Sequence, residues 1–94
     1  MFYAQVTFFG PDRGGRRSPP MSGYHPQLQL GAIMTSCVIE SLDGTTVFPF
    51  DQPYEVVIRL LFPQEYNHLL QAGMHVRFFE GSKCIGAGYM HDSA

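Results

Sequence analysis

Apolar side chains recur at every second position in several short stretches of this chain, and glycine or proline ends each stretch early. In residues 2–9 the alternate apolar positions are Phe2, Ala4, Val6 and Phe8. A period of two that is rich in aromatic and β-branched residues is typical of a strand with one face in the core. The pattern therefore predicts a chain built from short β-strands separated by turns.

Similar segments follow along the rest of the sequence. We expect further strands in residues 27–30, 33–40, 54–62, 74–79 and 83–90. Asp43-Gly44 lies between apolar flanks, which predicts a two-residue hairpin turn and a return strand through Val47. Gly81-Ser82 predicts a second tight turn between the last two strands.

Helix is expected at most once. Tyr66, Leu69 and Leu70 recur at helical spacing within residues 64–72, where a helical turn capped by Gly73 and an irregular segment are equally open. About six strands with so little helix favour a small barrel or sandwich. Closure removes the exposed strand edges of a short all-β chain, so we predict an all-β fold, a small six-stranded antiparallel β-barrel.

Composition restricts the classes of protein that remain. The 94 residues are 45% apolar and 15% charged, which suits one folded domain spanning residues 1–94. A formal charge of −2 gives no overall attraction to nucleic acid, and no apolar segment approaches the ~20 residues of a bilayer span, so we expect no membrane contact. Cys37 and Cys84 are far apart in the sequence, and we expect free thiols in a cytoplasmic protein. No metal-ligand spacing and no nucleophile–base arrangement is recognisable, so we predict no enzyme, cofactor or metal.

Residues 14–27 form the least ordinary segment, with three glycines, two arginines and three prolines in fourteen residues. Together with Arg13, the loop's Arg16 and Arg17 make this segment the cationic pole of the chain. A loop with few N–H donors leaves carbonyl groups unpaired, so one guanidinium is expected to tie it to the barrel, and Arg16 is the favoured candidate. Tyr24 is expected to pack against the barrel rather than to stack on bases.

Two motifs near the ends of the chain carry a family resemblance. Residues 14–27 (GGRRSPPMSGYHPQ) follow the spacing GGR-x-T-P-x-x-x-GYRPQ without a gap, and residues 80–88 (EGSKCIGAG) are similar to EGGRTVGAG. Both patterns resemble the C-terminal, third domain of elongation factor Tu and its relatives among the translational GTPases. The likeness covers nearly all of residues 2–90, and we expect this barrel domain to stand alone.

The resemblance implies a six-stranded antiparallel barrel that contacts the T-stem of aminoacyl-tRNA and the nucleotide-exchange partner. It implies tRNA contacts at Gln27, Ser36 and Gly81, where an amide, a hydroxyl and a backbone N–H bond phosphate or ribose without reading bases. No G-x-x-x-x-G-K-[ST] loop occurs in the sequence. We therefore expect no GTP binding by this chain.

Departures from the family pattern weaken its cationic face. His25 and Lys83 replace arginines, and Phe62 replaces a basic or polar residue before a proline. The chain also has more aromatic rings than a narrow barrel holds, so some are expected to face outward. We therefore predict a non-enzymatic binding module whose partner is a protein of the translation apparatus or a second copy of the chain.

Two alternatives stay open: weak direct binding of the tRNA acceptor/T-stem region, and a relic or fragment of a split factor. The residues predicted to contact the partner or the RNA are Arg13, Arg16, Arg17, Tyr24, His25, Gln27, Ser36, Gly81 and Lys83.

Overall fold

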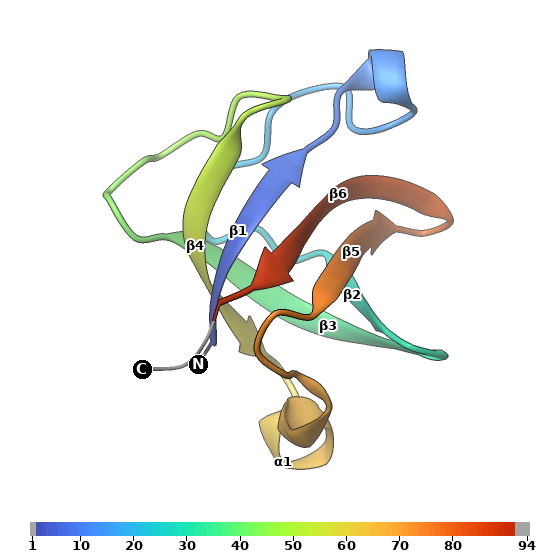
Figure 1. Ribbon diagram of the computed structural model, residues 1–94. Coiled ribbons are helices and arrows are strands. Elements are labelled where there is room, and N and C mark those ends of the chain that lie inside the picture. Colours follow the sequence, from blue (N-terminus) through green and yellow to red (C-terminus); the bar gives the residue numbers. More distant parts are fainter. Residues whose placement is uncertain (1, 92–94) are drawn as a thin grey trace.

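Six antiparallel strands close on themselves, each pairing with two neighbours, in the order β1-β4-β3-β2-β5-β6 (Figure 1). The structure is a computed structural model that describes residues 2–91. The strands are β1 (Phe2–Phe8), β2 (Gln27–Leu30), β3 (Ile33–Ser41), β4 (Pro53–Leu60), β5 (His75–Glu80) and β6 (Lys83–Met90). The prediction of an all-β, six-stranded antiparallel barrel is confirmed.

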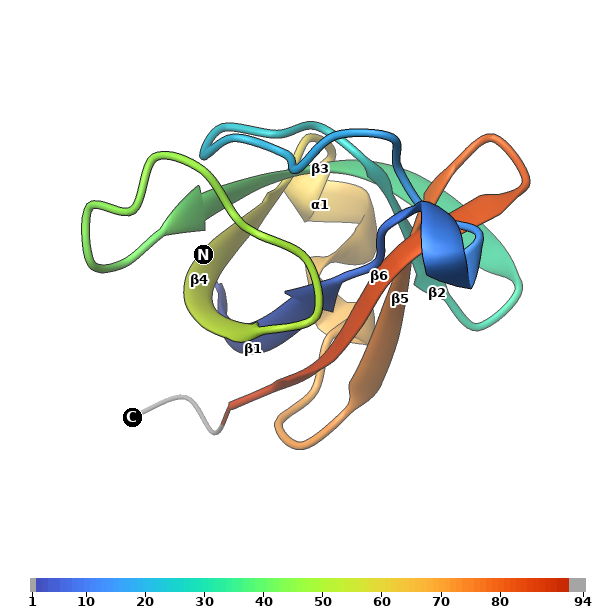
Figure 2. The same cartoon turned by 90° about the horizontal axis from the view of Figure 1, so that it is seen from above.

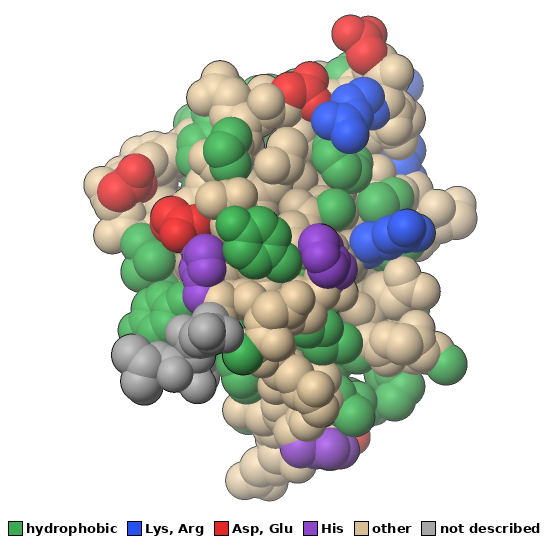
Figure 3. Space-filling model, viewed as in Figure 1, with side chains coloured by type: hydrophobic (Ala, Val, Ile, Leu, Met, Phe, Trp, Pro, Cys, Tyr) green, Lys and Arg blue, Asp and Glu red, His purple; other side chains and the backbone are tan. Residues whose placement is uncertain are grey.

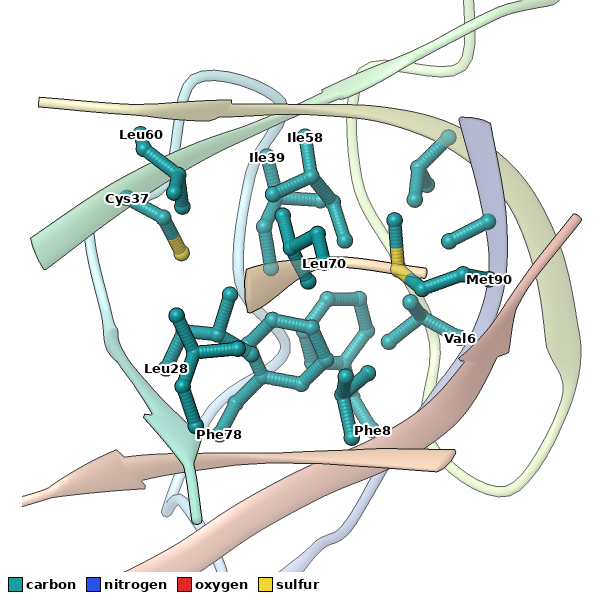
Figure 4. Packing of buried hydrophobic residues seen from close by; sticks show 14 of the residues in the cluster. Val6, Phe8, Leu28, Cys37, Ile39, Ile58, Leu60, Leu70, Phe78 and Met90 are labelled. Atoms are coloured by element: carbon teal, nitrogen blue, oxygen red, sulfur yellow. The ribbon is translucent and has the colours of Figure 1, made fainter. Parts of the chain in front are cut away.

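Alternate side chains of the strands fill the barrel (Figure 4). In β1 the fully buried members are Ala4, Val6 and Phe8, which belong to the alternate set that the sequence pattern predicts. The ring of Phe8 packs on that of Phe48 with centroids 5.2 Å apart. The interior is therefore a close-packed core, as small barrels require.

Two glycines in β6 allow β1 and β6 to approach closely. A Cβ atom on Gly88 would lie 2.0 Å from the carbonyl oxygen of Gln5, and one on Gly86 would lie 3.0 Å from that of Thr7. A backbone oxygen 2.0 Å from the Cβ position excludes any side chain, so only glycine fits at position 88. Glycine inside a strand is expected to mark such an approach, and here it does.

The segment after β3 differs from its prediction. Residues 42–52 form no return strand, because β3 pairs directly with β4 in a register that sets Ser41 against Val56. The chain bends at Asp43 instead of forming a two-residue hairpin turn, with the Thr45 N–H donating to Asp43 Oδ1 at 2.9 Å, and Val47 makes only an isolated bridge to Met21. The hairpin prediction was wrong.

The reason for this difference is Phe48, which lies within the long connection. Its side chain has no exposed surface and packs against Phe8 and Tyr54, with the Tyr54 ring centroid 5.1 Å away. The connection arches over one end of the barrel (Figure 2), and the Phe48 N–H donates to the Pro20 carbonyl at 2.9 Å. Burial of one aromatic ring therefore outweighs a short exposed hairpin.

The opposite end of the barrel carries the helical segment (Figure 1). It comprises α1 (Pro63–Tyr66) and the 3₁₀ turn η2 (Asn67–Leu69). A helical turn therefore forms, but it begins one residue before the expected range of 64–72 and ends before Gly73. Leu70 follows and is only 7% exposed, and Figure 4 shows its side chain inside the barrel. The helical turn therefore serves to place an apolar plug.

Both cysteines are free. Cys37 points into the core, and burial raises the pKa of its thiol to about 12. A thiol in this environment stays protonated and unreactive at neutral pH. No helix among residues 2–91 is long and apolar enough to cross a membrane.

Candidate binding surfaces

Residues 9–26 connect β1 to β2 over the same end of the barrel as the 42–52 connection (Figure 2). The Arg16 N–H donates to the Phe9 carbonyl at 2.9 Å. A Cβ atom on Gly15 would lie 1.9 Å from the same oxygen. The backbone of the loop therefore packs directly against the end of β1, and this close approach requires glycine at position 15, just before Arg16.

Arg16 fastens this loop to the barrel. Its Nε donates to the Ser18 carbonyl at 3.0 Å, its Nη1 pairs with the Glu80 carboxylate at the end of β5, and its guanidinium lies 4.6 Å from the centre of the Tyr24 ring. Arg16 ties the loop down as predicted, but it holds the barrel through the Glu80 carboxylate, and the carbonyl that it bonds belongs to the loop itself. Because its donors face protein groups, this arginine is largely occupied.

Tyr24 shares the same anchor. Its hydroxyl donates to Glu80, its carbonyl accepts from the Ile39 N–H of β3 at 2.9 Å, and its ring meets the edge of Phe8 at 6.1 Å. Burial, followed by the neighbouring carboxylate, raises the pKa of Tyr24 above its usual range, so the phenol keeps its proton. Tyr24 packs as predicted.

Arg13 and Arg17, the other two arginines of the cationic segment, differ in availability. Arg13 lies in the 3₁₀ turn η1 (Pro11–Arg13), pairs with Asp51 at 2.9 Å and covers the Phe9 ring at 4.1 Å. Arg17 is exposed, and among residues 2–91 it has no ion-pair partner. The cationic pole therefore offers one free arginine rather than three.

Gln27 and Ser36, the residues that the resemblance assigns to RNA, lie together on the outer face of β2 and β3. They are register partners, and the Gln27 side-chain amide donates to Ser36 Oγ at 3.1 Å. Gln27 is also opposite Phe79 of β5, one residue before Glu80. The Gln27–Ser36 pair therefore borders the Arg16–Tyr24 anchor.

The β5–β6 turn completes this region. Gly81 adopts a left-handed conformation with φ +60°, and Lys83 is the register partner of Glu80. His25 is exposed just before β2. The structure thus brings five of the predicted residues to the end of β5: Arg16, Tyr24, Gln27, Gly81 and Lys83. Ser36 lies one strand further, on β3. Arg17 and His25 are exposed beside Arg16 and Tyr24 in the sequence, and Arg13 lies apart, beside Phe9 and Asp51.

An apolar patch lies on the outer surface where β4 ends. The sequence predicts only that some aromatic rings face outward, and does not predict this patch. We define it as Met34, Leu61 and Phe62, which are 41%, 48% and 54% exposed. Leu61 and Phe62 follow β4, and the Leu61 N–H donates to the Ser36 carbonyl at 3.0 Å. Met34 lies two positions from Ser36 on the same face of β3. Phe62 fulfils the expectation that some rings face outward.

Residues 61–65 surround a shallow hollow of about 270 Å³ beside this patch. Within residues 2–91, no three His, Cys, Asp or Glu side chains gather closely enough to hold a metal ion. Comparison of the sequence with models of known protein families finds no match.

Proposed function

We propose that this chain is a non-enzymatic protein-interaction module that resembles the C-terminal domain of elongation factor Tu and acts in translation elongation. The observation that carries the proposal is the apolar patch beside the Gln27–Ser36 pair, on a barrel of the expected strand number. Exposed apolar clusters on small domains commonly mark protein contacts. The partner is a component of the translation apparatus or a second copy of the chain.

The charge distribution favours protein over RNA as the partner. Arg13 and Arg16 are engaged with Asp51 and Glu80, so the loop has lost most of its capacity for phosphate contacts. Nucleic-acid affinity depends on such free cations. The anchored loop instead offers a rigid, mostly neutral surface, which suits a protein partner.

A pull-down from cell lysate, run with and without nuclease, tests the proposal. We expect the chain to capture a protein that stays bound after nuclease treatment. This protein should no longer be captured when Leu61 and Phe62 are both changed to serine. Val47→Ser is the matched control, because Val47 is another exposed apolar residue, at 41%, outside the patch. A strictly monomeric chain in sedimentation that captures nothing, or equal loss in the control, contradicts the proposal.

Direct binding of the tRNA acceptor/T-stem region is the second candidate. The Gln27–Ser36 contact favours it, because both side chains lie on one outer face, and Arg17 and Lys83 are exposed cations without an ion-pair partner among residues 2–91. Two phosphate contacts predict a slope of log K against log salt of about −2. A titration of tRNA at two salt concentrations with Arg17→Ala decides this case, and no binding at low salt excludes it.

We place the protein in the cytoplasm, where two unpaired cysteines stay reduced. Its proposed activity needs no cofactor and no bound GTP. A fluorescent GTP analogue that bound the purified chain would contradict this part of the proposal.

A further inference from the structure

A hollow of about 660 Å³ opens on the outer face of β1, β5 and β6, away from the apolar patch. The side chains that give it its character are Phe9, Arg13, His75, Arg77, Ala87 and Tyr89. Figure 3 looks onto this face and shows histidine side chains on both sides of a hydrophobic one, with a basic side chain alongside. Its size is that of a site for a small organic ligand or a short polymer segment.

The strand register explains the shape of this groove. Ala87 of β6 stands between Thr7 and Arg77, so a small side chain forms the floor in that row. In the next row Tyr89 stands opposite His75. A low floor beside a projecting ring leaves room for a flat group to lie against the ring.

Tyr89 is held in a defined orientation. The His75 ring lies 6.2 Å from its centre, and the His91 ring meets it edge-on at 5.4 Å. His91 is itself fixed by Glu55, with Nε2 2.8 Å from Oε1. The Tyr89 side chain is still 36% exposed. A ring that is both oriented and accessible is a platform for stacking.

The charge of the groove is opposite to that of the whole chain. The formal net charge is −2, yet no Asp or Glu is among the described residues that line the hollow. Arg77 is exposed and, within residues 2–91, has no carboxylate partner. Arg13 at the rim already pairs with Asp51, so Arg77 is the free cation of the groove. The groove therefore suits an anionic ligand.

The fold narrows the class of that ligand. Every strand already has two neighbours, so no free edge is offered for an extended peptide to add as a strand. An amphipathic helix would need an apolar groove, whereas Arg77 and His75 project here. Cationic groups combined with accessible rings are the combination that binds single-stranded nucleic acid.

We propose that this groove binds a short segment of single-stranded nucleic acid, with a base stacked on Tyr89 and a phosphate at Arg77. The site is separate from the apolar patch and from the Gln27–Ser36 pair. It therefore adds a nucleic-acid contact to the proposed protein-interaction module without depending on it.

Fluorescence anisotropy with a short labelled oligouridylate, and the matching oligothymidylate, tests this inference at several salt concentrations. Tyr89→Ala is expected to weaken binding about tenfold, because one stacked base is lost, and Tyr89→Phe is expected to bind like the wild type. Arg77→Ala is expected to reduce the salt slope by about 0.7. Equal binding of both oligonucleotides would show that the site accepts both RNA and DNA. Tighter binding of one would identify that nucleic acid as the ligand.

Two controls keep the test specific. Arg59→Ala removes an exposed arginine that pairs with Glu40 outside the groove, and Gln27→Ala alters the alternative RNA surface; neither should change oligonucleotide binding. The proposal is overturned by no binding at low salt, by equal losses in Arg59→Ala and Arg77→Ala, by full affinity in Tyr89→Ala, or by equal competition from polyglutamate. Circular dichroism checks that each variant is folded.

Discussion

Replacing Phe48 with alanine tests the claim that the 42–52 connection is held by one buried ring. The side chain has no exposed surface and lies between Phe8 and Tyr54, with ring centroids 5.2 and 5.1 Å away. Truncating a fully buried phenylalanine costs about 3–5 kcal/mol, because transfer energy is lost and a cavity remains. Since small domains are stable by only about 5–15 kcal/mol, Phe48→Ala removes a large part of the total.

Urea unfolding followed by circular dichroism measures this loss. We expect a lower midpoint with an unchanged slope, because the surface exposed on unfolding is nearly the same. In a domain of this size each kcal/mol lowers Tm by about 4–8 °C, so Tm should fall by at least about 12 °C. Phe48→Leu keeps most of the buried volume and should cost much less.

Val47→Ala is the matched control for this experiment. Val47 precedes Phe48 in the same connection but is 41% exposed, so its truncation should change stability by at most about 0.5 kcal/mol. A loss below about 1 kcal/mol in Phe48→Ala, or equal losses in the two variants, would refute the reasoning. The connection would then be held by its backbone contacts instead of by the ring.

Two further outcomes follow from the packing. Gly88→Ala forces a Cβ atom into the Gln5 carbonyl and should cost about 3 kcal/mol in urea unfolding, the upper part of the usual range for overpacking, whereas Gly86→Ala should cost less; equal costs would contradict the close approach. The raised pKa of Cys37, about 12 against 9.0 for an unperturbed thiol, means that the unfolded chain releases this proton first as the pH rises. The contribution of the protonated thiol to the free energy of unfolding is complete below about pH 9 and is lost towards pH 12, by up to about 1.4 kcal/mol per pH unit. The unfolding free energy of Cys37→Ala should therefore decline less steeply than that of the wild type in that window. Identical pH profiles of unfolding free energy would refute it.

Local patterns in the sequence were sufficient for most of the architecture. Alternation in residues 2–9 predicts which side chains of β1 are buried, because strand geometry sends neighbours to opposite faces. Gly81-Ser82 predicts the last hairpin, since a tight turn depends only on adjacent residues. Glycines and prolines predict the loop at residues 14–27, and its shortage of N–H donors predicts an anchoring role for Arg16.

The candidate surfaces depend on contacts between distant residues, which no local pattern records. Arg13 meets Asp51 and Arg16 meets Glu80, at sequence separations of 38 and 64 residues, and these pairings decide which cations remain free. A signal for the groove existed in the alternation of His75 and Arg77 on β5, but its register with Tyr89 appears only when β5 and β6 pair.

The sequence by itself determined the six barrel strands, the Gly81-Ser82 turn and the glycines within β6, because backbone preference and side-chain alternation act between near neighbours. Only the tertiary structure decided that Phe48 covers the barrel instead of ending a hairpin, that the loop arginines are mostly occupied, and that Tyr89 and Arg77 share a groove. The physical reason is closure: a barrel forces each strand to accept two partners at one register, and this sets which distant side chains meet.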